Sequence, residues 1–70
     1  MKFTNLELIR KDRKLTRKDL EKLSGVNQYT IQALEEGRVD DVKLSTLIAL
    51  STALRIKAKH LLPFDIQKKL

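Results

Sequence analysis

Apolar residues recur at helical spacing through most of this 70-residue chain and predict a series of short helices. Thr4 and Glu7 have the spacing of a capping box, which satisfies free backbone N–H groups at a helix start. Leu6 and Ile9 then fall on one face. A first helix is therefore expected from Thr4 to about Arg13.

Two further helices follow directly, each with its own start and stop signals. Thr16 is a good N-cap, and Asp19 stands three residues later as in a capping box. Gly25 supplies the left-handed residue that commonly closes a helix. Asn27 caps the next helix, and Gly37 ends it. Two short helices joined by a short, glycine-containing turn form a helix-turn-helix.

The second of these helices has two different faces. When Ile31 and Leu34 point inward, the 3.6-residue period leaves a largely polar row on the outer face, namely Gln28, Tyr29, Gln32, Ala33 and Glu36. A glutamine amide can hydrogen-bond adenine in two places in the major groove of DNA. The row therefore fits a base-reading surface, but it also fits an ordinary solvated face, which is what most such rows are.

The second half of the chain continues the helical pattern after a loop at residues 38–43. A helix from about Leu44 or Ser45 to Leu54 carries a broad apolar stripe made of Leu44, Leu47, Ile48, Leu50 and Leu54. A last short helix at Ala58–Leu62 stops before Pro63. The tail, residues 64–70, fits a frayed end, a segment on the core or a contact with a second subunit. The fold class is all-α, with four to five short helices in one domain spanning residues 1–70 and a core of about residues 4–63.

Composition narrows the range of functions. The net charge of +6, from 15 Lys and Arg against 9 Asp and Glu, suits a polyanionic partner. Six of the basic residues lie between Arg10 and Lys18, where they favour phosphate contact or form a solvated face. The chain has no cysteine and a single histidine, His60, so we expect no metal, no cofactor and no enzymatic activity. No apolar run is long enough to span a membrane, and we expect a cytoplasmic protein.

Several of these residues together resemble a known family. The matching positions are Leu15-Thr16, Leu20, Gly25-Val26, Ile31, Leu34-Glu35 and Gly37. They are similar to the lambda-repressor-like, XRE-family (Cro-type) helix-turn-helix domains of bacteria and phages, over about Leu6 to Leu62. The resemblance implies a lambda-repressor-like fold, sequence-specific binding to double-stranded DNA and a role as a transcriptional regulator of repressor type.

The resemblance also implies roles for individual residues. It implies that bases are read by Gln28, Tyr29, Gln32 and Ala33. It implies that DNA phosphates are contacted from the start of the first helix of the motif and its surroundings, by Arg17, Lys18, Asn27, Thr30, Arg38 and Lys43. Arg10 and Glu35 match two family positions that form an internal ion pair. This pair ties the first helix to the second helix of the helix-turn-helix, which carries the base-reading residues.

The chain departs from the family pattern at a few positions. Glu21 stands where a small residue is usual, and Leu23 where a charge is common, which predicts a slightly rotated first helix of the motif. Residues 35–41 hold four acidic side chains against Arg38 alone, a net charge of −3 that would weaken binding beside the DNA backbone. We therefore expect weak binding per monomer, aided by a weak homodimer. The alternative is a protein-interaction module, of the antitoxin or phage-accessory kind, in which this acidic segment contacts a protein partner.

Overall fold

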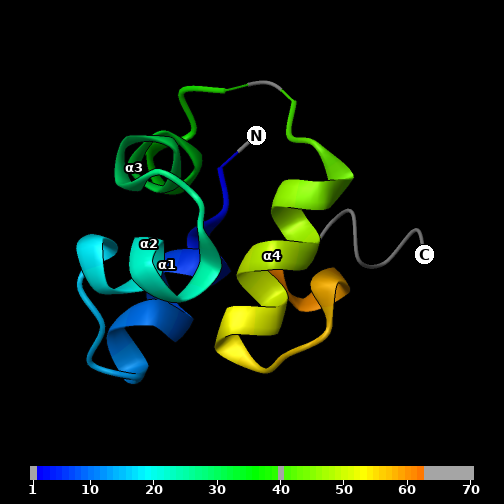
Figure 1. Ribbon diagram of the computed structural model, residues 1–70. Helices are drawn as coiled ribbons and strands as arrows, with labels where there is room; N and C mark the ends of the chain where they lie inside the picture. The colour runs from blue at the N-terminus through cyan, green and yellow to red at the C-terminus, as the bar shows by residue number, and fades with distance from the viewer. Residues whose placement is uncertain (1, 40, 63–70) are drawn as a thin grey trace.

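The computed structural model describes residues 2–39 and 41–62, and these form a small helical domain (Figure 1). The elements in order are α1 (Thr4–Asp12), α2 (Arg17–Ser24), α3 (Gln28–Glu36), α4 (Leu44–Leu54) and the 3-10 helix η1 (Ala58–Leu61). No strand occurs in the described ranges. The predicted all-α class is thus confirmed.

Helix α1 begins differently from the prediction. Its N-cap is Phe3, and no side chain caps it. Thr4 already lies inside the helix, while Glu7 accepts a hydrogen bond from Lys11 Nζ at 2.8 Å, one turn later. The predicted capping box of Thr4 and Glu7 is therefore wrong. The start of α1 is held instead by a tertiary contact, because the Phe3 backbone N–H donates to the Leu34 carbonyl at 3.0 Å.

The predicted signals around α2 and α3 are confirmed. The Asp19 backbone N–H donates to Thr16 Oγ1 at 3.0 Å, and the Thr16 backbone N–H donates to Asp19 Oδ2 at 2.9 Å. Asn27 caps α3 through its side-chain oxygen. Gly25 and Gly37 close the two helices with φ angles of +79° and +75°, values at which a Cβ is strained. The helix-turn-helix is therefore built by its local sequence signals.

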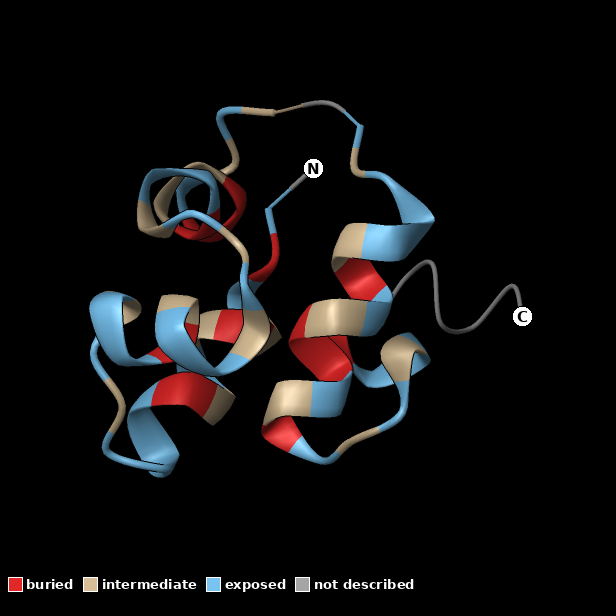
Figure 2. Ribbon diagram, in the orientation of Figure 1, coloured by how far each residue is buried: buried red, intermediate tan, exposed pale blue. Residues whose placement is uncertain are grey.

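The core lies where the four helices and η1 meet, and Figure 2 shows their buried sides turned toward one another. Each large aliphatic side chain buried there stabilises the fold by about 1.5–3 kcal/mol relative to exposure. The buried apolar residues are Phe3, Leu6, Leu20, Ile31, Leu34, Leu47, Leu50, Leu54 and Leu61. The core thus includes Phe3, one residue before the expected boundary.

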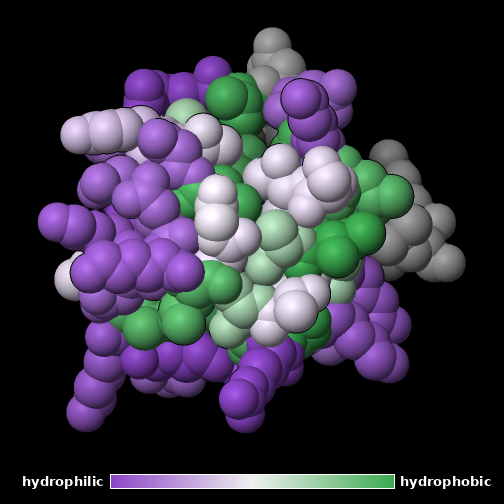
Figure 3. Space-filling model, viewed as in Figure 1, coloured by the Kyte–Doolittle hydropathy of each residue, from purple (hydrophilic) through white to green (hydrophobic). Residues whose placement is uncertain are grey.

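Helix α4 buries a narrower stripe than its sequence pattern predicts. Leu47, Leu50 and Leu54 are buried, but Leu44 is 68% exposed and Ile48 is 49% exposed. These two residues are one turn apart and share the side of α4 that faces away from the other helices. Figure 3 shows hydrophobic surface at the right of the same view, on the side of the molecule where α4 lies. Only one edge of the broad apolar stripe is therefore buried, and the other edge leaves apolar surface exposed on α4.

The chain after α4 turns sharply without glycine. Arg55 ends α4 in the left-handed conformation, with φ of +58°, and η1 then covers Ala58–Leu61. The expected last short helix is thus present as a 3-10 helix. The expectations for Pro63 and the tail at residues 64–70 lie outside the described residues. None of the helices in the described part is long and apolar enough to cross a membrane.

Candidate nucleic-acid interface

The four predicted base-reading residues lie together on the outer side of α3. Ile31 and Leu34 are buried and fix the rotation of this helix about its own axis. Tyr29 is 69% exposed on the opposite side. The remaining three candidates, Gln28, Gln32 and Ala33, are partly exposed. The arrangement presents two amides, a phenol and a methyl group on a short helix that is anchored from behind.

A contact from α2 holds the start of α3. The backbone N–H of Gln28 donates to Glu21 Oε2 at 3.0 Å. A carboxylate is favourable at this place, because the first turn of a helix has unpaired N–H groups and a partial positive charge. Glu21 therefore caps α3 from the neighbouring helix, a role that sequence reasoning missed. Its acidic charge ahead of a helix start was the available signal, but the distance between the two residues could not be read from the sequence.

A buried ion cluster joins α1, α2 and α3. Arg10 meets Glu35 with two bonds, from Nε to Oε2 at 2.7 Å and from Nη2 to Oε1 at 3.0 Å. Arg10 Nη1 also donates to the Leu15 carbonyl at 2.8 Å. The hydrogen bonds to Glu35 raise the pKa of Arg10, against the effect of burial. The structure thus brings together the two residues for which the family resemblance implies an internal pair.

Arg17 joins the same cluster, which the sequence did not reveal. Its Nε donates to Glu35 Oε1 at 2.9 Å, and its side chain stays 32% exposed. Glu35 is fully buried, and this single carboxylate faces the guanidinium groups of both Arg10 and Arg17. The cluster retains a net positive charge, and its accessible member stands at the first residue of α2.

The acidic segment at residues 35–41, which begins in the last turn of α3, differs from the expectation. Glu35 is buried and paired, so it does not add to a negative surface beside DNA, and it is not available to a protein partner. Glu36 is exposed but pairs with Arg38, with 2.8 Å between Oε1 and Nε. Asp40 lies outside the described residues. The expected charge of −3 therefore overstates the exposed negative charge by one carboxylate, that of Glu35, because Arg38 was already counted and Asp41 is exposed.

The predicted phosphate contacts are distributed around the helix-turn-helix. Lys18 on α2, Thr30 on α3 and Lys43 at the N-cap of α4 are exposed. The side chains of two others already have partners, because Asn27 Oδ1 accepts from the Tyr29 backbone and Arg38 binds Glu36. The basic run that begins at Arg10 is not one continuous face, because Arg10 itself is buried.

A chain of polar contacts runs along the outer side of α3 to Arg38, the second residue after the helix ends. Gln32 Nε2 donates to Glu36 Oε2 at 3.2 Å, and Arg38 Nε donates to the other carboxylate oxygen. The hydrogen bond from Gln32, followed by the hydrogen bond and charge of Arg38, lowers the pKa of Glu36 against the opposing effect of desolvation. Glu36 is therefore an anion at neutral pH and connects a predicted base reader to a predicted phosphate contact.

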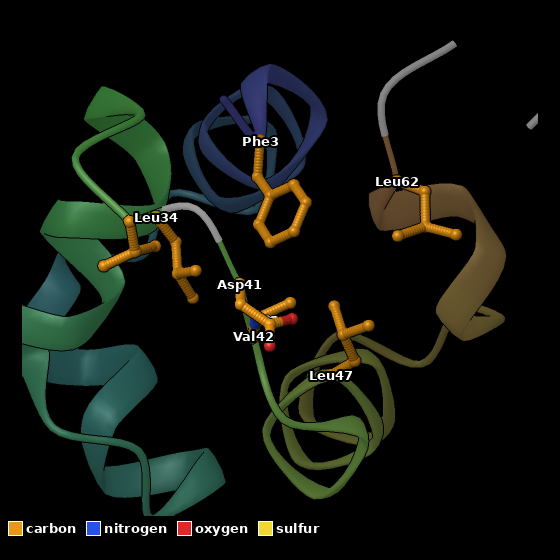
Figure 4. A pocket seen from close by; sticks show the side chains of 7 residues that line it. Phe3, Leu34, Asp41, Val42, Leu47 and Leu62 are labelled. Atoms are coloured by element: carbon orange, nitrogen blue, oxygen red, sulfur yellow. Dashed lines mark hydrogen bonds between the residues drawn. The ribbon is translucent and has the colours of Figure 1, made fainter. Parts of the chain in front are cut away.

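A pocket of about 190 Å³ lies on the inward side of α3 (Figure 4). Leu34, Val42 and Leu47 are among the side chains that surround it, and Asp41 is the one charged group among its described lining residues. In the described part of the chain, no group of three or more His, Cys, Asp or Glu side chains is placed to hold a metal ion. The pocket is apolar space between core elements, separate from the outer side of α3.

Comparison of the sequence with protein families gives a match over most of the chain. The model of a Cro/C1-type HTH DNA-binding domain matches residues 5–65 of this chain. This range contains every element from α1 to η1 except the first residue of α1. Comparisons with curated proteins and with solved structures gave no match.

Proposed function

The chain belongs to the Cro/C1-type helix-turn-helix DNA-binding family, and from that premise we propose that it reads a specific sequence in double-stranded DNA and represses transcription. Members of this family are DNA-binding domains rather than enzymes, and binding by the helix-turn-helix follows from membership. The observation that supports sequence reading is the outer side of α3, where Tyr29 and Gln32 point away from the buried Ile31 and Leu34 and Gln28 borders them at the first turn.

In this proposal α3 enters the major groove with its first turn toward the base edges. The amides of Gln28 and Gln32 pair with adenine, which offers a donor and an acceptor there. The methyl group of Ala33 meets the methyl group of thymine. Tyr29 contacts a neighbouring base edge. Glu21 anchors the start of α3, and this contact supports base reading by α3. The side chains that contact bases must be held within a fraction of an ångström of the productive geometry.

Phosphate contacts hold the domain in register on the duplex. We assign them to the accessible charged and polar groups that border α2, α3 and α4, namely Arg17, Lys18, Asn27, Thr30, Arg38 and Lys43. Arg17 is the best supported of these, because Glu35 orients its guanidinium while leaving a third of the side chain exposed. These contacts carry no sequence information, and their strength falls with salt.

A weak homodimer completes the proposal. Leu44 and Ile48 form an exposed apolar pair on α4 that a second copy can cover. Dimeric readers of this type bind two half-sites about one helical turn apart. Sedimentation that shows a monomer at high concentration, with and without DNA, would exclude the dimer. We place the protein in the cytoplasm of a bacterium or of a phage-infected cell.

Selection from random duplex DNA by the purified protein, at low and moderate salt, tests the function. Enrichment of a short motif with two-fold symmetry is the expected result. The Gln28→Ala variant should then select a motif that is relaxed at one position of each half-site, by about 1–3 kcal/mol. Binding that disappears with salt and enriches no sequence would contradict sequence reading, and a protein partner would then be sought.

A further inference from the structure

Glu36 occupies a place on the outer side of α3 that general DNA binding does not explain. It is an exposed carboxylate one turn after Gln32, on the surface proposed to face DNA. Each of its oxygens has a different partner: Oε2 accepts from Gln32 Nε2 at 3.2 Å, and Oε1 accepts from Arg38 Nε at 2.8 Å. A negative charge here opposes binding to phosphate, so its presence calls for a role of another kind.

The chemistry of the carboxylate restricts the amide beside it. An ionised carboxylate only accepts hydrogen bonds, whereas a glutamine amide has a donating end and an accepting end. Gln32 must therefore turn its NH₂ group toward Glu36 and its carbonyl oxygen away. Arg38 occupies the other carboxylate oxygen, which keeps Glu36 from rotating away from Gln32. One N–H of the amide is used by Glu36, and the second remains beside the carbonyl oxygen.

We propose that Glu36 is a positioning residue that fixes the amide of Gln32 in the orientation that selects adenine over guanine. This inference rests on the proposed function, in which Gln32 reads a base. The oriented amide offers one acceptor and one donor side by side, matching the N6 amino group and N7 of adenine. Guanine presents two acceptors, O6 and N7, so the fixed carbonyl oxygen meets O6 with like polarity.

Without Glu36, the amide can rotate by half a turn and donate its NH₂ to guanine instead. Glu36 therefore lowers affinity for every sequence through its charge, and it raises the preference for adenine at one position. Arg38 limits the first effect, because its guanidinium neutralises the carboxylate locally. Loss of Glu36 should thus move total affinity and base preference in opposite directions. A residue that only supports the fold would lower total affinity without favouring one base over another.

The test measures the affinity of purified variants for duplexes that differ at single base pairs of the selected site. Gln32→Ala first identifies the position that Gln32 reads. Glu36→Gln keeps the size of the side chain but removes its charge and its fixed acceptor character. Glu36→Asp keeps the charge but is too short to hold the Gln32 amide in the same way. Glu7→Gln, on α1, is the matched control for loss of one partly exposed carboxylate that pairs with a residue one turn along a helix.

We expect Glu36→Gln to bind all duplexes at least as tightly as the parent, and to lose about fivefold or more of the adenine-over-guanine preference at the Gln32 position. Glu36→Asp should lose the same preference without the gain in affinity, and Glu7→Gln should keep it. An unchanged preference in both Glu36 variants, at a position that Gln32→Ala does flatten, overturns the positioning role and leaves base reading by Gln32 intact. If Gln32→Ala flattens no position, base reading by Gln32 fails and the positioning role fails with it.

Discussion

The buried ion cluster gives the sharpest prediction of stability, through the substitution Glu35→Gln. Glu35 is fully buried and accepts three guanidinium hydrogen bonds, two from Arg10 and one from Arg17, at 2.7–3.0 Å. Glutamine has nearly the same size, so the substitution leaves no cavity. It removes the negative charge and turns an NH₂ group toward two cations. Arg10, which is 6% exposed, is then left as a buried charge without a counter-ion.

Removing one partner of a buried ion pair costs about 3–5 kcal/mol, because the remaining charge stays desolvated. A hydrophobic core in a domain of this size rarely supplies more than about 3–5 kcal/mol of net stability. The expected loss is therefore about as large as the whole free energy of unfolding. Glu35→Gln is therefore expected to be largely unfolded at 25 °C, although the substitution is nearly isosteric and removes no apolar side chain.

Urea denaturation followed by circular dichroism at 222 nm, a helix signal, measures this effect. Arg17→Ala is the matched control, since it removes one guanidinium bond to Glu35 and leaves the Arg10 pair in place. Its side chain is 32% exposed, so the loss should be about 1 kcal/mol or less. If Glu35→Gln lowers the free energy of unfolding by less than about 1 kcal/mol, the reasoning is refuted. Burial of the Arg10 charge would then not require Glu35 as a counter-ion.

Further predictions concern acid stability, the helix ends and DNA binding. The hydrogen bond from the backbone of the α2 N-cap lowers the pKa of Asp19 below its ordinary value of 3.8, so its contribution is present above pH 3.8 and is lost as the pH falls through the lower value in the folded state. The difference in unfolding free energy between the parent and Asp19→Asn should accordingly shrink to zero in acid, and a constant difference down to pH 2 would contradict this. Gly25→Ala should cost about 1–2 kcal/mol in urea denaturation from the left-handed φ alone, because nothing lies within 4 Å of the new Cβ. Gly37→Ala should cost more, since its Cβ would also lie 3.1 Å from that of Lys2, and equal losses would argue against this close approach. Lys43→Ala should weaken binding to every duplex alike and reduce the slope of log affinity against log salt by about 1, and a base-specific loss would instead make Lys43 a reader.

Local signals in the sequence were sufficient for the helix-turn-helix itself. The capping box of Thr16 and Asp19, the cap at Asn27 and the two closing glycines act within one helical turn, so neighbouring residues decide them. The Thr4–Glu7 spacing carried the same signal but did not cap a helix, because the start of α1 is drawn one residue earlier by the bond from Phe3 to the Leu34 carbonyl. A local signal thus predicts a helix end only where no tertiary contact competes with it.

The face that α3 presents also followed from the sequence, since burial of Ile31 and Leu34 leaves one side for the polar row. For α4 the same reasoning was insufficient, because a broad apolar stripe does not say which of its edges meets a partner. Leu44 and Ile48 lie exposed because the other helices pack against the opposite edge. Periodicity determines which residues share a side, and packing determines how much of that side is covered.

The electrostatics of the interface were decided by tertiary structure. The sequence determined the charges themselves, the all-α class and the family match, because these depend on composition and on short-range spacing. It did not determine that Arg17 shares Glu35 with Arg10, or that Glu21 caps the start of α3, because these contacts join different helices. The interaction of two charges depends on their distance and on their exposure to water, and both are set only when the helices pack.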